Sequence, residues 1–333
     1  MKNIFREIIF CLIFILIGLF GFIGISSAVC PDPKPLGMLY CYDFEDWTGN
    51  PVTTPGYLFG TNDAGFWTDH LASSEVVTSC SVGAQSWTPH TGTYFIMFDN
   101  YSGAYNACLG GTSYGVNPYF QIGGGIYTYG NNSDFVIEDL IHEEAGDREL
   151  FFSGWLRIDP NLYTDPNLDS VSGGAALKVI RFQLYSTEGV ILYYRGGGQH
   201  NLCVAEYGGN NWDNAVDTVV AAGIDLADGN WHKISFWVRL PDVLGSGDNM
   251  HVKSWLDASD ENIDTPIHDL YLPTLVTPVP KLDLVALTIN YSAYYPSMRN
   301  VMAWDDISFW DGMPSADIID IIPPAAPSGL TIN

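Results

Sequence analysis

The sequence predicts an all-β protein built as an antiparallel sandwich of two sheets or a jelly roll. Short segments in which apolar and polar residues alternate recur along the 333 residues, and many of the 34 glycines and 19 prolines lie between them. These segments do not follow the strand–helix–strand order of a parallel sheet. Aromatic residues make up 14% of the chain, which is typical of a folded core and not of a disordered chain.

The expected strands follow one another along most of the chain. The clearest is 231–240, where Ile234, Phe236, Val238 and Leu240 alternate with polar or aromatic residues. The strands are predicted at 38–44, 94–98, 119–129, 149–158, 175–185, 189–195, 231–240, 250–256, 283–289 and 301–310. Residues 134–145 are the only candidate for a helix, and they give a weak pattern.

Both ends of the chain differ from the domain between them. Lys2 and Arg6 precede an apolar run over 8–25, and small residues follow at 26–28, so residues 1–28 have the form of a secretory signal peptide. The run is also long enough for an uncleaved membrane anchor. The domain is expected at 29–313, followed by a proline-rich linker or tail at 314–333 that could engage a surface or matrix partner. We therefore expect a secreted or cell-surface protein without membrane contact after cleavage.

The charge of the chain excludes one class of partner. The net charge is −25, and it becomes −26 without residues 1–28, which hold two of the 13 basic and one of the 38 acidic residues. Nucleic-acid binding needs a basic surface, so we expect no nucleic-acid partner. A local basic patch could still act on an anionic ligand within a Debye length of about 8 Å.

The cysteines suit an oxidising compartment. After cleavage, the chain keeps Cys30, Cys41, Cys80, Cys108 and Cys203. Sequence alone does not fix their pairing, but Cys30–Cys41 and Cys80–Cys108 are the preferred disulfides, which leaves Cys203 as a buried thiol. No spacing of cysteines and histidines indicates zinc.

A series of short motifs resembles the concanavalin-A-like lectin/glucanase superfamily, which includes laminin-G-like jelly rolls. The motifs are YDFED at 42–46, HTGTYFIMF at 90–98, FSGWLRID at 152–159, DGNWHK at 228–233 and AWDDISFWDG at 303–312. The resemblance spans about residues 38–312 and implies two curved antiparallel sheets, the concave one often forming a glycan groove. Each motif is weak alone, and their order is more informative about the fold than about activity.

The alternation within the strands independently favours a sugar-binding surface. Several strands carry an apolar stripe on one face and a mixture of aromatic, basic and amide side chains on the other. Aromatic faces cover the C–H face of a pyranose, and forked polar side chains reach its hydroxyls. The predicted ligand-binding residues are Trp155, Arg181, Gln183, Tyr185, Trp237 and Trp255. Exposed strand faces also favour such residues without any ligand, so a purely structural role stays open.

A structural calcium ion is implied by the same resemblance. Many members of the superfamily hold calcium between the N-terminal region and the closing strand, and the matching positions here are Glu45, Gly92, Asp305 and Asp306. Carboxylates and backbone carbonyls are the oxygen ligands that calcium prefers. The alternative is that these acidic residues lie solvated at strand ends.

Catalysis is the less favoured expectation. Glucanases of this fold carry paired carboxylates on one strand, and no such pattern is present. A polysaccharide lyase would need a group that neutralises a uronate carboxylate and a second group that removes the adjacent proton. Arg181, Gln183, Tyr193 and His200 could supply that set. The sequence thus predicts a non-catalytic, lectin-like carbohydrate-binding protein, with a lyase or a structural, adhesive surface protein as alternatives.

Overall fold

The computed structural model describes residues 30, 35–45, 67–69, 74–99, 119–123, 149–160, 176–184, 188–195, 201–207, 220–240, 249–273, 282–288 and 301–314. Every regular element assigned among them is a β-strand, and every strand pair is antiparallel. Within these ranges, no helix has the length and apolar character needed to cross a membrane. The predicted signal peptide, the helix candidate at 134–145 and nearly all of the predicted tail lie outside them.

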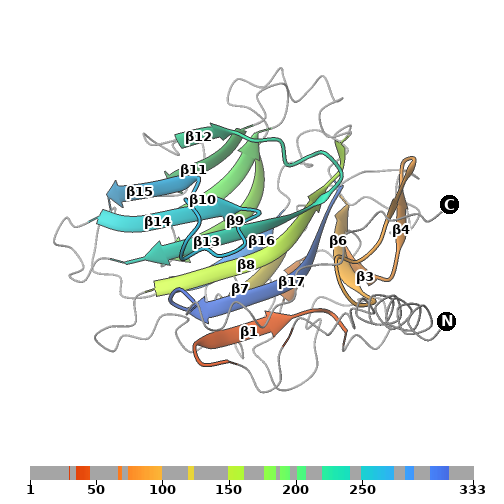
Figure 1. Ribbon diagram of the computed structural model, residues 1–333, viewed down its shortest axis with the longest axis horizontal. Coiled ribbons are helices and arrows are strands. Elements are labelled where there is room, and N and C mark those ends of the chain that lie inside the picture. The colour runs from red at the N-terminus through yellow and green to blue at the C-terminus, as the bar shows by residue number, and fades with distance from the viewer. Residues whose placement is uncertain are drawn as a thin grey trace, which may run out of the picture.

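The strands form two large sheets and one hairpin (Figure 1). Sheet A has eight strands, in the order β15 (His268–Pro273), β14 (Asn249–Leu256), β13 (Trp231–Arg239), β8 (Glu149–Ile158), β17 (Val301–Asp311), β6 (Phe95–Asp99) and β3 (Ser74–Val77), with β1 (Met38–Tyr42) also paired to β17. Sheet B has seven, in the order β12 (Val220–Gly223), β11 (Asn201–Tyr207), β10 (Glu188–Arg195), β9 (Ala176–Leu184), β16 (Leu282–Thr288), β7 (Tyr119–Gly123) and β2 (Trp67–Asp69). The hairpin joins β4 (Cys80–Val82) to β5 (Gln85–Trp87).

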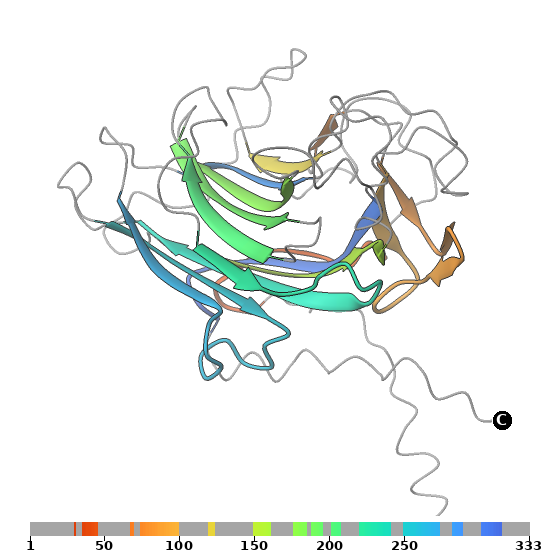
Figure 2. The ribbon, with the colours of Figure 1, turned by 90° about the horizontal axis from the view of Figure 1, so that it is seen from above.

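The two sheets pack face to face as a jelly-roll sandwich. Figure 2 shows sheet A curving around sheet B, so that the inner faces of both sheets enclose one core. The chain repeatedly crosses between the two sheets. Strands β6, β8 and β17 belong to sheet A, and strands β7, β9 and β16, which alternate with them along the sequence, lie side by side in sheet B. The predicted fold class, a two-sheet antiparallel sandwich, is therefore confirmed.

The main core lies between the sheets and follows the predicted alternation. Ile234, Phe236 and Val238 of β13 are fully buried in it. The ring of Phe236 stacks on Phe182 of β9 with centroids 5.0 Å apart, which joins the two sheets directly. Burying a large apolar side chain contributes about 1.5–3 kcal/mol, so such contacts across the sandwich are its main source of stability.

Sheet A is unusual because large apolar residues also cover its outer face. Trp237, Trp255, Phe151 and Trp310 form a second apolar cluster there with Met38 of β1 and Ala258. We call residues 257–267, which join β14 to β15, the strap. At the other end of the sheet, the β4–β5 hairpin packs Trp87 and Val82 against Phe95 and Met97. The outer face of sheet A is therefore an interior surface over much of its area.

The structure tests part of the predictions made for the cysteines. Cys30 and Cys41 form a disulfide with Cα atoms 5.4 Å apart, as predicted. Cys203 is a buried free thiol, also as predicted. Cys80 is disulfide-bonded as well, but Cys108 lies outside the described residues, so the Cys80–Cys108 pair stays a prediction.

The core contact between the sheets gives the first testable expectation. Phe236→Ala should lower the free energy of unfolding by about 3–5 kcal/mol, because it leaves a cavity opposite Phe182. Urea unfolding of the protein measures this loss. Ile263→Ala is the control, since Ile263 is 79% exposed and its truncation should change stability by less than about 0.5 kcal/mol. Equal effects of the two substitutions would contradict the assignment of the core.

Candidate functional site

The outer face of sheet B carries the best grouping of predicted site residues. In β9, Ile180 and Phe182 point into the core, so Arg181 between them lies on the opposite face. In β10, Ile191 is the direct partner of Arg181, and Tyr193 follows two residues later on the same face. We call this surface the Arg181 face and define it by Arg181, Ile191, Tyr193 and their β11 partners Ala205 and Cys203.

The Arg181 face combines one guanidinium with an enclosed apolar cluster. Ile191, Tyr193, Cys203 and Ala205 are all buried, although they point away from the main core. Arg181 beside them is partly exposed. Water screens charges poorly next to such a cluster, so hydrogen bonds from the guanidinium to an anionic ligand gain strength.

The predicted lyase residues fall on this face as far as they are described. Arg181 and Tyr193 share it, and Gln183 occupies the next register position on the same face, opposite Gly189. Neighbouring strands lie about 4.8 Å apart and two residues advance about 6.7 Å, so the Cα atoms of Arg181 and Tyr193 are separated by about 8 Å. Tyr193 is 6% exposed, so Arg181 is the more open of the two residues on this face. His200 lies outside the described residues.

The predicted ligand-binding set does not form one surface. Trp155, Trp237 and Trp255 belong to β8, β13 and β14 of sheet A, whereas Arg181 and Gln183 belong to β9 of sheet B. Tyr185 lies outside the described residues. The idea of a single groove lined by all of these residues is therefore wrong. Alternation shows which residues share a face of one strand, but it does not show which strands share a sheet.

Trp237 and Trp255 have structural surroundings instead of an open sugar platform. They are 7% and 2% exposed, because the strap lies over them. The indole N–H of Trp237 donates to Glu149 Oε2 at 3.1 Å, and that of Trp255 donates to the carbonyl of Asp264 at 2.9 Å. The contacts of Lys233 and Trp255 with the strap thus account for these two residues on the outer face without any ligand.

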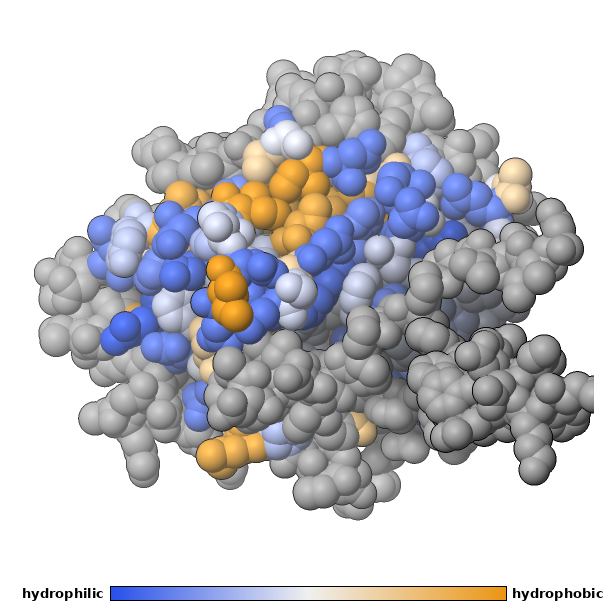
Figure 3. Space-filling model, viewed as in Figure 1, coloured by the Kyte–Doolittle hydropathy of each residue, from blue (hydrophilic) through white to orange (hydrophobic). Residues whose placement is uncertain are grey.

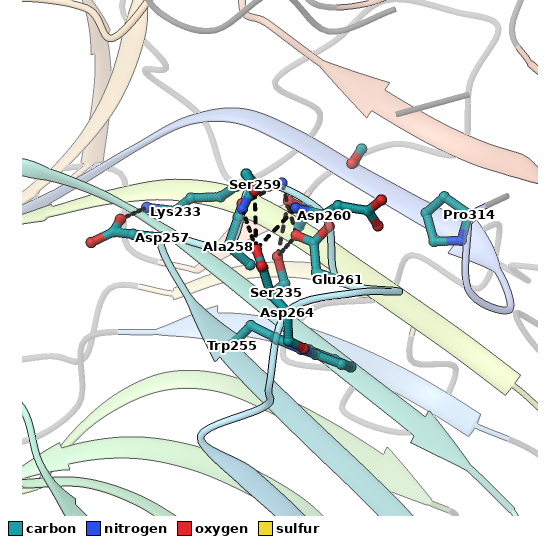
Figure 4. Close-up of polar contacts among 12 residues, drawn as sticks. Lys233, Ser235, Trp255, Asp257, Ala258, Ser259, Asp260, Glu261, Asp264 and Pro314 are labelled. Atoms are coloured by element: carbon teal, nitrogen blue, oxygen red, sulfur yellow. Dashed lines mark hydrogen bonds and ion pairs between the residues drawn. The ribbon is translucent and has the colours of Figure 1, made fainter. Parts of the chain in front are cut away.

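Figure 4 shows how polar contacts fasten the strap to sheet A. Glu261 of the strap is buried, and its Oε1 accepts a hydrogen bond from Ser235 Oγ at 2.5 Å. The same oxygen pairs with Lys233 Nζ at 2.7 Å, so the buried carboxylate has an opposite charge and a hydroxyl as partners. Asn262 Nδ2 donates to the carbonyl of Pro314 at 3.0 Å, which joins the strap to the end of the domain.

A histidine between two carboxylates lies beside the strap. His232 Nδ1 is 2.8 Å from Asp257 Oδ2, and its Nε2 is 3.1 Å from Asp228 Oδ1. Burial acts to lower the pKa of His232, but the hydrogen bonds and charges of Asp257 and Asp228 outweigh it, and the pKa is raised. The protonated form is therefore favoured in the folded protein.

The residues predicted to bind calcium lie together around residues 90–94. Glu45 Oε1 accepts hydrogen bonds from the backbone N–H groups of Thr93 and Tyr94 at 2.5 and 3.0 Å. Gly92 has a φ of +61°, and a Cβ there would overlap the carboxylate of Glu45. Asp305 Oδ2 accepts from the backbone N–H of His90 at 2.8 Å.

Asp306 completes this network. It has a φ of +49°, and the pairing of β17 with β8 shifts between Asp305 and Ser308, so two consecutive carboxylates reach the same loop. Its Oδ2 lies 2.6 Å from His90 Nδ1, and its Oδ1 accepts from Thr91 Oγ1 at 2.7 Å. Burial, followed by the charge of Asp306, raises the pKa of Asp305 well above its usual value.

The carboxylate oxygens of this network are already engaged by hydrogen bonds within the protein. Calcium needs six to eight oxygen ligands, but the oxygens named above already accept hydrogen bonds from the protein. Among the described residues, no three histidine, cysteine or acidic side chains are arranged to hold a metal ion. Calcium binding at these residues stays a prediction.

Sequence reasoning gave no role to His90, which turns out to organise this region. Its ring stacks on Trp155 with centroids 3.7 Å apart and meets Trp231 edge-on at 6.2 Å. One face of the predicted sugar-stacking Trp155 is thus already covered. The signal available in the sequence was the polar turn His90-Thr91-Gly92, whose glycine adopts a positive φ.

The comparisons with known proteins give distant likenesses only. No protein-family model matches the chain, and no curated protein does. A PL-14 alginate lyase from Aplysia kurodai is 9% identical with a TM-score of 0.42, covering 74% of this chain and 89% of its own. The alginate lyase Aly36B is 6% identical, covering 65% and 80%, with a TM-score of 0.38.

A structure of botulinum neurotoxin type C, described as interacting with two ganglioside molecules, is 11% identical with a TM-score of 0.38. The match covers 74% of this chain and 45% of the toxin chain, so this chain spans less than half of that protein. Similarity at this level carries no argument about what this chain binds or catalyses. The candidate site therefore rests on the chain's own residues.

The raised pKa of His232 predicts a pH-dependent stability. A histidine whose pKa is raised on folding stabilises the protein fully below its unfolded pKa of about 6.5, and this contribution is lost as the pH rises through the folded value. His232→Gln should therefore lower the melting temperature more at about pH 6 than at about pH 8.5. Scanning calorimetry of both proteins at both pH values tests this, and a pH-independent difference would contradict it.

A chelator experiment separates the calcium prediction from the hydrogen-bonded network. If the network alone holds residues 90–94, EGTA should leave the melting temperature unchanged. Asp306→Asn should then cost about 1.5–3 kcal/mol, the usual scale for a hydrogen bond to a charged group. A native-state ion would instead stabilise the protein by mass action. A fall in melting temperature with EGTA, reversed by calcium, would support the predicted ion.

Proposed function

We propose that the protein binds an extracellular polysaccharide on the Arg181 face of sheet B. The observation that carries this proposal is the shared face of Arg181 and Tyr193, with Gln183 at the next register position. Arg181 is a partly exposed residue beside a buried apolar cluster that includes Tyr193, so its hydrogen bonds to a ligand are poorly screened by water. On the outer face of sheet A, the predicted residues Trp237 and Trp255 are covered by the strap and its apolar cluster.

The chemistry of Arg181 favours a uronate-containing chain. The guanidinium fork matches a carboxylate with two parallel hydrogen bonds, and a neutral hydroxyl would use only part of it. The net charge of −25 opposes a polyanion at long range, so affinity must come from contact with this one group. We therefore expect moderate affinity that depends strongly on Arg181.

A lyase is the second candidate, favoured by the separation between Arg181 and Tyr193. In such a reaction, the guanidinium stabilises the negative charge that develops on the uronate carboxylate as its neighbouring proton leaves. In this candidate mechanism, the hydroxyl of Tyr193, a residue that is 6% exposed, would exchange that proton. The glycosidic oxygen then departs with a proton, and the sugar keeps a carbon–carbon double bond.

Secretion belongs to the same proposal. The signal-like residues 1–28 provide a route out of the cell. The Cys30–Cys41 disulfide supports an oxidising destination, because cytosolic thiols are normally kept reduced. An extracellular protein would meet polysaccharides at the cell surface or in the matrix.

Binding to uronate oligomers tests the proposal. Oligomers of alginate and of polygalacturonate should bind the mature protein in calorimetric titrations. Arg181→Ala should weaken binding by about 1.5–3 kcal/mol, and Arg181→Lys by less, because lysine keeps the charge but loses the fork. Both variants should melt close to the wild type. If neither oligomer binds, or if Arg181→Ala binds as well as the wild type, the proposed site is wrong.

The lyase candidate has a separate measurement. Incubation with the same oligomers should yield products with the ultraviolet absorbance of an unsaturated uronate. Tyr193→Phe should abolish this signal while leaving oligomer binding within about threefold, because the substitution removes only the hydroxyl. Binding without any unsaturated product would leave the protein as a lectin.

A further inference from the structure

A row of side chains crosses sheet A outside the area that the strap covers. Glu149 of β8, Arg239 of β13, His251 of β14 and Tyr271 of β15 are successive cross-strand partners. The neighbouring row contains Trp237, Lys253 and Asp269. We call the surface formed by Glu149, Arg239, His251, Lys253, Asp269 and Tyr271 the Tyr271 ladder. Figure 3 shows the outer face of sheet A, on which this ladder lies, as mainly hydrophilic.

Tyr271 is an exposed aromatic residue that is nevertheless held in place. It is 65% exposed, and the other large hydrophobic side chains exposed to this degree in the described ranges, Leu36 and Ile263, are aliphatic. Its ring stacks on His251 with centroids 4.2 Å apart and planes at 13°. One face of the tyrosine is therefore fixed against the protein while much of the residue stays open to solvent.

The support beneath Tyr271 is itself anchored. His251 meets Trp237 edge-on at 4.9 Å, and the indole of Trp237 is fixed by Glu149. His251 Nε2 is bonded to Asp269 Oδ1 at 2.5 Å. The hydrogen bond from His251 lowers the pKa of Asp269, so the carboxylate stays ionised and keeps its partner. An aromatic ring held in this way loses little conformational freedom when a ligand stacks on it.

The polar groups around the ring are balanced in charge. Lys253 Nζ lies 3.6 Å from Asp269 Oδ2, and Arg239 Nε lies 3.5 Å from Glu149 Oε1. The ladder thus pairs two basic with two acidic residues, in a chain that has 13 basic and 38 acidic residues. Such a surface offers donors and acceptors to hydroxyl groups without attracting an ion of either sign.

We propose that the Tyr271 ladder is a binding site for a neutral sugar chain, separate from the Arg181 face. The open face of Tyr271 would stack on the C–H face of a pyranose, and Lys253, Asp269 and Arg239 would bond its hydroxyls. The paired charges disfavour a uronate here. The absence of a continuous apolar patch along the ladder's described residues disfavours a protein partner, since interface centres are apolar.

The site does not depend on the proposed function, because the two faces belong to different sheets. Linking a neutral-sugar site to a second site on the same domain would let the protein hold two chains, or two segments of one chain. The two proposed sites should therefore bind different ligands, and binding at each should depend on different residues.

The test uses the mature protein and neutral hexasaccharides of glucose, mannose, xylose and galactose, with binding followed by saturation-transfer NMR and calorimetry. At least one should bind the wild type. Tyr271→Ala should weaken that binding about tenfold, and Tyr271→Phe should retain it, because the ring carries the stacking contact. Ile263→Ala is a matched control on the same sheet face, and it should bind as the wild type does.

The outcomes distinguish the two proposals. Arg181→Ala should leave neutral-sugar binding intact, and Tyr271→Ala should leave uronate binding intact. The ladder is refuted if no neutral hexasaccharide binds, or if Tyr271→Ala binds as tightly as the wild type. Melting temperatures of both Tyr271 variants should match the wild type, so a loss of binding cannot be assigned to unfolding.

Discussion

The structure depends on the need to bury both faces of sheet A. Its strands carry large apolar residues at consecutive positions, such as Phe151 and Phe152 in β8 or Phe309 and Trp310 in β17, and consecutive residues point to opposite faces. Sheet B covers only one of these faces. The strap, the β4–β5 hairpin and β1 supply the cover on the other. Each contributes to an apolar cluster there, and polar contacts also fasten the strap. Sheet A is in effect the middle layer of the protein.

The acidic composition makes sense within this arrangement. Loops that cover a sheet present backbone N–H groups without strand partners, and these groups need acceptors. Glu45, Asp257, Asp264 and Asp305 all accept hydrogen bonds from the backbone. Part of the negative charge of the chain therefore belongs to carboxylates that accept hydrogen bonds from backbone N–H groups. Glu45 and Asp305, which the sequence predicted as calcium ligands, also accept such backbone hydrogen bonds.

The sequence predicted the fold class and most long strands, because alternation of period two reports directly on a pleated strand with one buried face. It predicted the buried stripe that Ile234, Phe236 and Val238 of β13 form with Leu240. It missed β15, since His268-Asp269-Leu270-Tyr271 continues into Pro273 and is poor in β-branched residues. It also mistook Trp237 and Trp255 for ligand contacts, because alternation identifies the second face of a strand without showing what covers that face. Trp237 and Glu149, which share a hydrogen bond, lie 88 positions apart in the chain, and no local sequence pattern reports a contact over that separation.

The strap is also a part of the domain whose length could change while the two sheets stay fixed. It is a single connection between neighbouring strands, and its internal turns are closed by Asp264, which accepts from Ser259 and Asp260 within the strap. The exposed Ile263 marks a point where its backbone reaches solvent. An insertion at that point would lengthen a surface loop, a change that domains tolerate well, without altering the register of either sheet. During evolution, or in the hands of an engineer, new recognition loops could be added to this sandwich at the strap while its two sheets remain the same.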